Sequence, residues 1–352
     1  MCGIKHLLGE NTVKYVKLGR AGIKVSRLGL GSSNFGPHPE KPFALDIDRT
    51  EAIVARACEL GINFFDSAET YMFGEAERTL GEALRRVGPT REEIVVQTKC
   101  GPGSVRFKVN RSGLSRKHLL NAIDESLERL QLDYIDIYTI HRLDGETPFE
   151  ETCEVLHEIV KSGKARYIGI SSAFAWQVER MLGIQERNGW TKFVVMQNQY
   201  ALNYREEERE MIPLLIDRGM AMTPWGVLSA GLLAGNIQRD GTRSTIRAKT
   251  DLLRGEKGFI GNSEQDFDIQ DKVRAIAEKR GVSMAEVGMA WALSKPFIQS
   301  CLIGASSPAQ IDSSVAALDI VLSPEDIAFL EEGYQPVNVQ TIGSMMPVMA
   351  AK

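Results

Sequence analysis

Long hydrophobic runs and close-spaced cysteines are both missing from this chain of 352 residues. No apolar stretch approaches the ~20 residues of a membrane-spanning helix, so we expect no membrane span. The five cysteines are odd in number, scattered and never spaced as CxxC, which disfavours a disulfide framework or a zinc site. The first residues also lack the apolar core of a signal peptide. Together these absences favour a cytoplasmic protein.

An excess of positive charge is missing as well. The formal net charge is -4, whereas domains that bind nucleic acids are usually basic, so we expect no nucleic-acid partner. The five histidines form no HExxH-like pair, and we expect no metal site. The remaining composition is that of an ordinary globular protein, and it leaves a monomer and a homo-oligomer equally open.

Short apolar segments alternate with amphipathic helical stretches along the whole chain. Several of these segments are almost uniformly hydrophobic, as parallel strands buried on both faces should be. A doubly wound fold is disfavoured because residues 29–34 lack the third glycine of GxGxxG. Eight segments spaced by roughly 30 residues instead predict an α/β fold of the (β/α)8 barrel type: residues 26–31, 61–65, 94–99, 134–140, 167–170, 193–197, 221–225 and 298–303.

The remaining segments frame this barrel. Residues 15–18 and 24–26 predict an N-terminal β-hairpin that closes its bottom. The long polar stretch 230–267, after the seventh strand, is typical of a functional loop. We expect residues 1–13 to be a disordered leader and residues 14–335 a single barrel domain. Residues 336–352 are then a C-terminal tail that either covers the substrate pocket or stays disordered.

Three of the predicted strands end on an ionisable side chain. Asp66 follows the second strand, with Tyr71 five residues on, while Lys99 ends the third strand and His141 follows the fourth. Catalytic groups of α/β barrels sit at the C-terminal ends of the strands, so we expect these four to converge. A phenol can supply a proton to a carbonyl oxygen, and a nearby ammonium lowers the pKa of that phenol. His141 would orient the oxygen and Asp66 would hold Lys99.

Each of the four also has a structural interpretation. Asp66 could cap the following helix, Tyr71 could pack in the core, Lys99 could end a solvated strand, and His141 could be a buried structural histidine. Their occurrence together on successive strand ends favours catalysis.

The segment from Gly61 to Tyr71 resembles the GxxxxDTAxxY signature of the aldo-keto reductases, with Ser67 in place of Thr. Lys99 and His141 match the other two members of that family's tetrad. The resemblance covers roughly residues 14–335, and residues 164–172 and 197–200 resemble the bacterial and potassium-channel β-subunit-like branch. It implies a (β/α)8 barrel that binds an extended nicotinamide dinucleotide.

The resemblance also implies which residues hold the cofactor. Ser171, Ser172 and Gln197 fall where the family binds the carboxamide, with Ser172 replacing the common Asn, and Trp225 falls where an aromatic ring stacks on the nicotinamide. A core tryptophan is the structural alternative for Trp225. The pyrophosphate loop would contain Gly226, Val227, Leu228, Gly231 and Leu232, and the adenosine end Gly304, Ser306 and Gln310.

The choice between the two dinucleotides depends on cations, because a 2′-phosphate needs Arg or Lys. Arg243, in the loop after the seventh strand, aligns best with the phosphate-clamping residue of relatives, although the basic residues of this loop could also form a solvated face. We therefore favour NADP(H) and leave the use of NAD(H) open.

The substrate is less well specified by the sequence. Candidate pocket residues include two polar side chains among mostly apolar ones, which suits an aldehyde or a bulky hydrophobic or xenobiotic ketone, and hence a role in detoxification: Asn34, Phe35, Met72, Phe73, Phe107, Arg142 and Leu143. The sequence thus predicts an NADP-dependent carbonyl reductase with Tyr71 as proton donor, which can also oxidise alcohols. The alternative is a cofactor-binding regulatory module of the channel β-subunit type, with slow catalysis.

Overall fold

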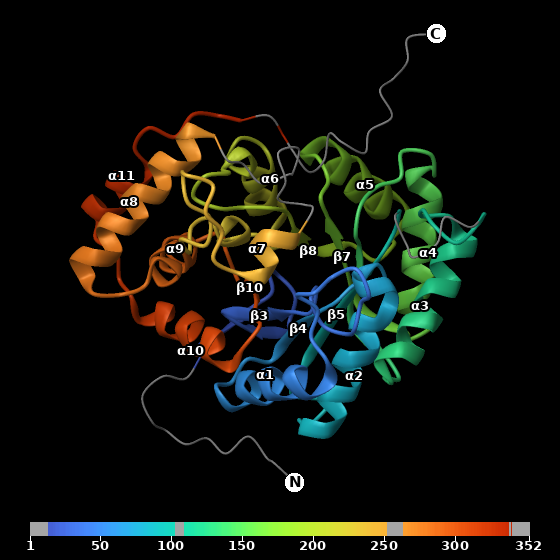
Figure 1. Cartoon of the computed structure of the whole chain (residues 1–352). Helices are drawn as coiled ribbons and strands as arrows, with labels where there is room; N and C mark the ends of the chain where they lie inside the picture. Colours follow the sequence, from blue (N-terminus) through green and yellow to red (C-terminus); the bar gives the residue numbers. More distant parts are fainter. Residues whose placement is uncertain (1–12, 103–108, 252–262, 338, 340–352) are drawn as a thin grey trace.

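Eight parallel strands form the centre of the molecule in the computed structural model, which describes residues 13–102, 109–251, 263–337 and 339 (Figure 1). A parallel bridge between Met222 and Ile298, and a bond of 3.0 Å from the Leu302 N–H to the Pro224 carbonyl, close the ring between its first and last strands. The predicted (β/α)8 barrel is therefore confirmed. In ring order its strands are β10 (Cys301–Gly304), β3 (Leu28–Gly31), β4 (Phe64–Asp66), β5 (Val95–Cys100), β6 (Ile135–Ile140), β7 (Ala165–Ser171), β8 (Phe193–Gln197) and β9 (Ala221–Met222).

The seventh barrel strand, β9, is shorter than the predicted 221–225. The Thr223 N–H still donates to the Met196 carbonyl at 2.9 Å, but Pro224 has no N–H with which to continue the ladder. Pairing resumes at Trp225, which forms an isolated parallel bridge with Gln199 beyond the end of β8.

The predicted N-terminal hairpin is also confirmed and consists of β1 (Tyr15–Lys17) and β2 (Lys24–Ser26). The Arg20 N–H donates to the Gly219 carbonyl at 2.9 Å, and the Tyr15 hydroxyl donates to the Gly61 carbonyl at 2.8 Å. Since Gly61 and Gly219 lie shortly before β4 and β9 in the chain, the hairpin lies at the N-terminal ends of the strands.

The barrel interior changes from apolar to polar along the strands. Alternate strand residues share a face, so the side chain two positions further along points the same way. Near the hairpin the interior is a buried apolar cluster: Leu18, Val25, Phe64, Val95, Ile137, Val195, Ala221 and Leu302. Two positions further along five of these strands the residues are polar and buried: Asp66, Gln97, Thr139, Gln197 and Thr223. Polar chemistry is thus concentrated toward the C-terminal ends.

Helices surround the strands (Figure 1). They are α1 (Ile47–Glu59), α2 (Glu75–Val87), α3 (Arg116–Leu130), α4 (Phe149–Lys161), α5 (Ala175–Asn188), α6 (Met211–Arg218), α7 (Ile246–Thr250), α8 (Glu264–Arg280), α9 (Met284–Leu293), α10 (Pro308–Ala316) and α11 (Pro324–Glu331). Among the residues that the structure describes, none of these helices is long and apolar enough to span a membrane.

The long stretch after β9 contains α7 and a small buried cluster of Leu232, Ile237, Ala248 and Phe267. Its residues 252–262 lie outside the described part of the chain, as do residues 1–12 of the predicted leader and residues 340–352 of the predicted tail.

The packing of α2 against α3 depends on a glycine. A Cβ at Gly81 would lie 2.3 Å from the Leu130 carbonyl oxygen, whereas one at Gly183 in α5 would meet only the flexible Arg187 guanidinium, at 3.4 Å. We expect Gly81→Ala to lower the free energy of unfolding by about 1–3 kcal/mol through overpacking. Gly183→Ala should raise it by about 0.5–1 kcal/mol, because alanine favours a helix interior. Urea unfolding of both variants checks this, and an unchanged midpoint for Gly81→Ala would contradict the close packing.

Candidate active site

Lys99 is the centre of the cluster at the C-terminal ends of the strands. Its side chain is fully buried, and its ammonium donates to Asp66 Oδ2 at 2.7 Å and to the Ser67 carbonyl at 2.7 Å. It also donates to the Tyr71 hydroxyl at 3.3 Å. The structure therefore brings together Asp66 of β4, Lys99 of β5 and Tyr71 of the turn after β4, as the sequence predicted.

The Asp66 carboxylate is held from three sides. Besides Lys99, it accepts a hydrogen bond from Gln97 Nε2 at 2.8 Å and one from Gln197 Nε2 at 3.0 Å, both at Oδ1. A buried ion pair is stable only when its remaining hydrogen-bonding positions are filled, and the two glutamines fill them. Sequence reasoning missed Gln97, although its place two residues before Lys99 on one strand puts both on the same face.

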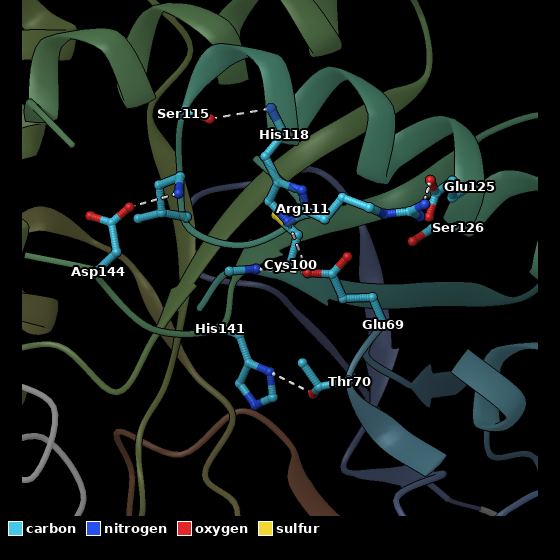
Figure 2. Close-up of polar contacts among 12 residues, drawn as sticks. Glu69, Thr70, Cys100, Arg111, Ser115, His118, Glu125, Ser126, His141 and Asp144 are labelled. Atoms are coloured by element: carbon cyan, nitrogen blue, oxygen red, sulfur yellow. Dashed lines mark hydrogen bonds and ion pairs between the residues drawn. The ribbon is translucent and has the colours of Figure 1, made fainter. Parts of the chain in front are cut away.

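His141 completes the group from the end of β6. The backbone N–H of His141 donates to the Cys100 carbonyl at 2.7 Å. The His141 ring meets the Tyr71 ring edge-on, with centroids 5.6 Å apart. Its Nδ1 lies 3.3 Å from Thr70 Oγ1, a contact that sequence reasoning did not identify (Figure 2).

The pKa of Tyr71 differs from the sequence-based expectation. Burial raises this pKa above 10.0, and although the Lys99 ammonium works in the opposite direction, burial prevails. Burial also tends to lower the pKa of Lys99, but attraction by the Asp66 carboxylate and the hydrogen bonds to Asp66 and Tyr71 raise it overall. Tyr71 is therefore a neutral phenol beside a charged ammonium at neutral pH.

Burial lowers the pKa of His141 well below its ordinary value of 6.5, and the charges of Lys99 and Arg142 add to this effect. His141 is therefore a neutral imidazole with a single N–H. Burial also lowers the pKa of Arg142, while Tyr71 raises it. The predicted pocket residue Arg142 thus lies close enough to influence both Tyr71 and His141.

The residues expected at the nicotinamide lie on neighbouring strands. The Ser171 hydroxyl donates to the Gln197 carbonyl at 2.6 Å and lies 3.3 Å from the Ser172 hydroxyl. The backbone N–H of Trp225 donates to the Asn198 carbonyl at 3.2 Å, which places Trp225 beside the end of β8. These four residues thus lie at three neighbouring strand ends, and Gln197 among them contacts Asp66.

The segment after Trp225 turns sharply. Gly226, Ser229, Ala230 and Gly231 all have positive φ, and Ser229 bonds to Asn203. Within this segment Val227 and Leu232 are buried and Leu228 packs against the core. Positive φ at non-glycine residues is costly and clusters at ligand-binding sites, and here it also occurs at Met72, Phe73 and Ser172.

Two arginines, Arg49 and Arg247, lie near β10 and the segment after it, and a third, Arg243, belongs to the same loop as Arg247. Arg49 donates to the Ser306 carbonyl at 3.3 Å, and Arg247 lies 3.7 Å from the position that a Cβ would take at Gly304. Arg243 donates to the Ala248 carbonyl at 2.8 Å in the same loop as Arg247. The Gln310 Oε1 accepts from the backbone N–H of Ser306 at 2.7 Å.

Another basic residue of that loop is engaged elsewhere. Arg239 pairs with three carboxylates of α8, namely Glu264, Asp268 and Asp271, so it behaves as part of a solvated ion network.

The predicted substrate-pocket residues are distributed unevenly. Asn34 is buried and donates to the Ala305 carbonyl at 2.9 Å, and Phe35 and Met72 lie in the hydrophobic core. Phe73 is 58% exposed and packs on His38, while Leu143 is partly buried next to Arg142. Phe107 lies outside the described residues. Their role in substrate binding stays a prediction.

No group of three or more His, Cys, Asp or Glu side chains suited to a metal ion occurs in the part of the chain that the structure describes. The donor set at the strand ends instead fits an organic cofactor. Amide and hydroxyl groups suit a carboxamide, an indole suits an aromatic ring, and a tight backbone turn and arginines suit phosphates.

Comparisons with known proteins agree with this arrangement. The family model described as "Aldo/keto reductase family" matches residues 27–335. The chain is 39% identical to versiconal hemiacetal acetate reductase of Aspergillus parasiticus, over 92% of this chain and 98% of that protein. It is 38% identical to aldo-keto reductase AMT2 of Alternaria alternata, over 91% of each. It is 36% identical to the putative aryl-alcohol dehydrogenase C977.14c of Schizosaccharomyces pombe, over 93% of this chain and 97% of that protein.

These relatives are fungal proteins, and the resemblance to the bacterial and channel β-subunit-like branch stays a prediction. The family match, the barrel and the cluster around Lys99 lead to one conclusion: the chain belongs to the aldo/keto reductase family, whose oxidoreductases use nicotinamide cofactors to act on small carbonyl compounds or alcohols.

Proposed function

We propose that this protein is an NADPH-dependent carbonyl reductase in which Tyr71 donates the proton to the carbonyl oxygen. The observation that carries the proposal is the buried Lys99 ammonium, which contacts both Asp66 at 2.7 Å and Tyr71 at 3.3 Å. We also propose residues 14–335 as the single catalytic domain, which the family match over 27–335 supports.

Each side chain then has a defined task. When bound, a nicotinamide cofactor would supply the hydride that the carbonyl carbon receives. Tyr71 transfers its hydroxyl proton to the oxygen, and the adjacent Lys99 ammonium stabilises the phenolate as it forms. Asp66 keeps Lys99 charged and in place, and His141, as a neutral donor, orients the oxygen. The same residues can run the reaction in reverse as alcohol oxidation.

Ser171, Ser172, Gln197 and Trp225 would hold the nicotinamide, and residues 226–232 the pyrophosphate. We propose that Arg243 contacts the 2′-phosphate from the loop after β9, near Gly304, Ser306 and Gln310. Arg247 lies in the same region and is the alternative contact.

For the substrate we propose an aryl or other bulky hydrophobic aldehyde or ketone. One relative is named as an aryl-alcohol dehydrogenase and another as a reductase of versiconal hemiacetal acetate. The partly exposed apolar surfaces of Leu143, Trp225 and Phe73 lie in the segments around the site and suit such compounds.

Removing the proton donor is the direct test of the mechanism. Tyr71→Phe should lower kcat for an aryl aldehyde by about 100- to 10,000-fold, because a positioned general acid contributes that much. Cofactor binding, followed by fluorescence titration, should stay as in the wild type. Tyr134→Phe is the matched control, since Tyr134 packs between Arg91 and Arg166 away from this site. Full turnover by Tyr71→Phe would exclude Tyr71 as the donor.

The pKa directions predict a flat pH profile for reduction. Tyr71 must be protonated and His141 neutral, and their pKa values lie above 10.0 and below 6.5. Both groups therefore stay reactive across the neutral range, and kcat/KM should be constant between about pH 6.5 and 9. It should fall only at higher pH, as phenolate forms. An ionisation near pH 7 in kcat/KM, measured with saturating NADPH, would contradict these assignments.

The cofactor preference can be tested in the loop after β9. Arg243→Ala should raise the Kd for NADPH about tenfold, the loss of one charge-assisted contact, and leave the Kd for NADH nearly unchanged. Arg239→Ala is the matched control, because Arg239 pairs with α8 and should affect neither. Equal losses for both cofactors would argue against a 2′-phosphate contact. If the wild type binds a cofactor but turns over no aldehyde or ketone of a broad panel, the regulatory-module alternative is favoured.

A further inference from the structure

The Thr70 side chain lies directly behind the imidazole of His141. Thr70 Oγ1 is 3.3 Å from His141 Nδ1, and Figure 2 shows this contact. Thr70 precedes Tyr71 in the chain, so one short segment carries both the proton donor and a group that touches the second catalytic side chain.

A shared frame holds this contact in place. The backbone N–H of Glu69 donates to the Lys99 carbonyl at 3.0 Å, and the backbone N–H of His141 donates to the Cys100 carbonyl at 2.7 Å. The Gly101 N–H then donates to Glu69 Oε1 at 3.0 Å. Three consecutive residues at the end of β5 therefore fix both the segment before Tyr71 and the start of the turn after β6.

The same segment is fastened from the side of α3. The Glu69 carboxylate is buried, and its Oε1 lies 3.4 Å from Nε2 of His118, which is buried in the first turn of that helix (Figure 2). Glu69 is thus held by two elements: its backbone N–H bonds to β5, and its carboxylate contacts His118 of α3. The backbone that carries Thr70, the next residue, is therefore fixed close to His141.

The hydrogen-bond partner of His141 Nδ1 determines whether the other ring nitrogen, Nε2, is a hydrogen-bond donor or an acceptor. A neutral imidazole has one N–H, and the group bonded to one nitrogen selects which nitrogen carries it. If the Thr70 hydroxyl donates to Nδ1, the proton lies on Nε2, which can donate to a carbonyl oxygen. If Nδ1 carries the proton, Nε2 is only an acceptor and repels that oxygen.

We propose that Thr70 is a positioning residue whose hydroxyl donates to His141 Nδ1 and so keeps the Nε2–H tautomer facing the substrate oxygen. The inference rests on the proposed reductase function, because only a carbonyl acceptor requires a donor at Nε2. No covalent step is involved, and Thr70 itself stays out of contact with the reacting atoms.

The test compares Thr70→Val, which keeps the shape and removes the hydroxyl, with Thr70→Ser, which restores it. Long-range 1H–15N spectra of histidine-labelled protein report which nitrogen of His141 is protonated, and His141→Gln assigns the signal among the five histidines. The wild type and Thr70→Ser should show the Nε2–H form. Thr70→Val should show a mixture of both tautomers.

Kinetics on an aryl aldehyde supply the second measurement. Thr70→Val should lower kcat/KM about tenfold, which corresponds to about 1.4 kcal/mol. Thr70→Ser should recover most of that loss, and the Kd for the cofactor and the thermal midpoint should stay unchanged in both variants. A proton on Nδ1 in the wild type, or a wild-type tautomer and rate in Thr70→Val, would overturn the proposal.

The two hypotheses fail in different ways. If the wild type reduces no carbonyl, the proposed function fails, whereas the spectra still decide whether Thr70 sets the tautomer. If the wild type is an active reductase but Thr70→Val matches it in both measurements, only the role of Thr70 is lost.

Discussion

A single ammonium inside the barrel constrains everything around it. Lys99 has no exposed surface, so its charge must be balanced and its donors must be used within the protein. Asp66 supplies the opposite charge, the Ser67 carbonyl takes a second hydrogen bond, and Tyr71 takes the third. Breaking such a buried pair by removing one partner typically costs about 3–5 kcal/mol, since the other charge is left unbalanced. The barrel can bear this arrangement because rigid strand ends fix the position of each partner.

Along the barrel axis, the apolar residues that stabilise the fold and the polar residues of the candidate site occupy different layers of the interior. At the hairpin end, side chains such as Phe64, Val95 and Ile137 form a dry apolar cluster. Two residues further along these strands the interior side chains are polar. Another two residues further along, they are Lys99 on β5 and His141 just after β6. Strand geometry imposes this spacing, because every second side chain enters the barrel. A substitution at the polar end can therefore alter the reaction while the apolar cluster continues to hold the fold.

The strand ends were predictable from the sequence, whereas contacts across strands were not. Asp66, Lys99 and His141 each end an apolar run, and in a parallel barrel all such ends meet on one face. The bonds from Gln97 and Gln197 to Asp66 depend on register between strands that are far apart in the sequence. The contact from Thr70 to His141 depends on a turn conformation that no periodicity encodes. Likewise, positive φ at Ser172 comes from its tertiary surroundings, since serine alone disfavours it.

The direction of the Tyr71 pKa resolves an apparent conflict in the mechanism. A phenol whose pKa is raised by burial is a weaker acid, although the neighbouring ammonium should make it a stronger one. In the resting site the desolvation of a phenolate outweighs that attraction, so the proton stays on Tyr71 and is available. In the proposed reduction, the substrate oxygen would become far more basic than the phenol as it gains alkoxide character, and transfer from Tyr71 would then be favourable without a lowered resting pKa. In this proposed mechanism the Lys99 ammonium would act mainly on the charge that develops on the Tyr71 oxygen during transfer. Its fixed position 3.3 Å away means that little reorganisation is needed at that moment.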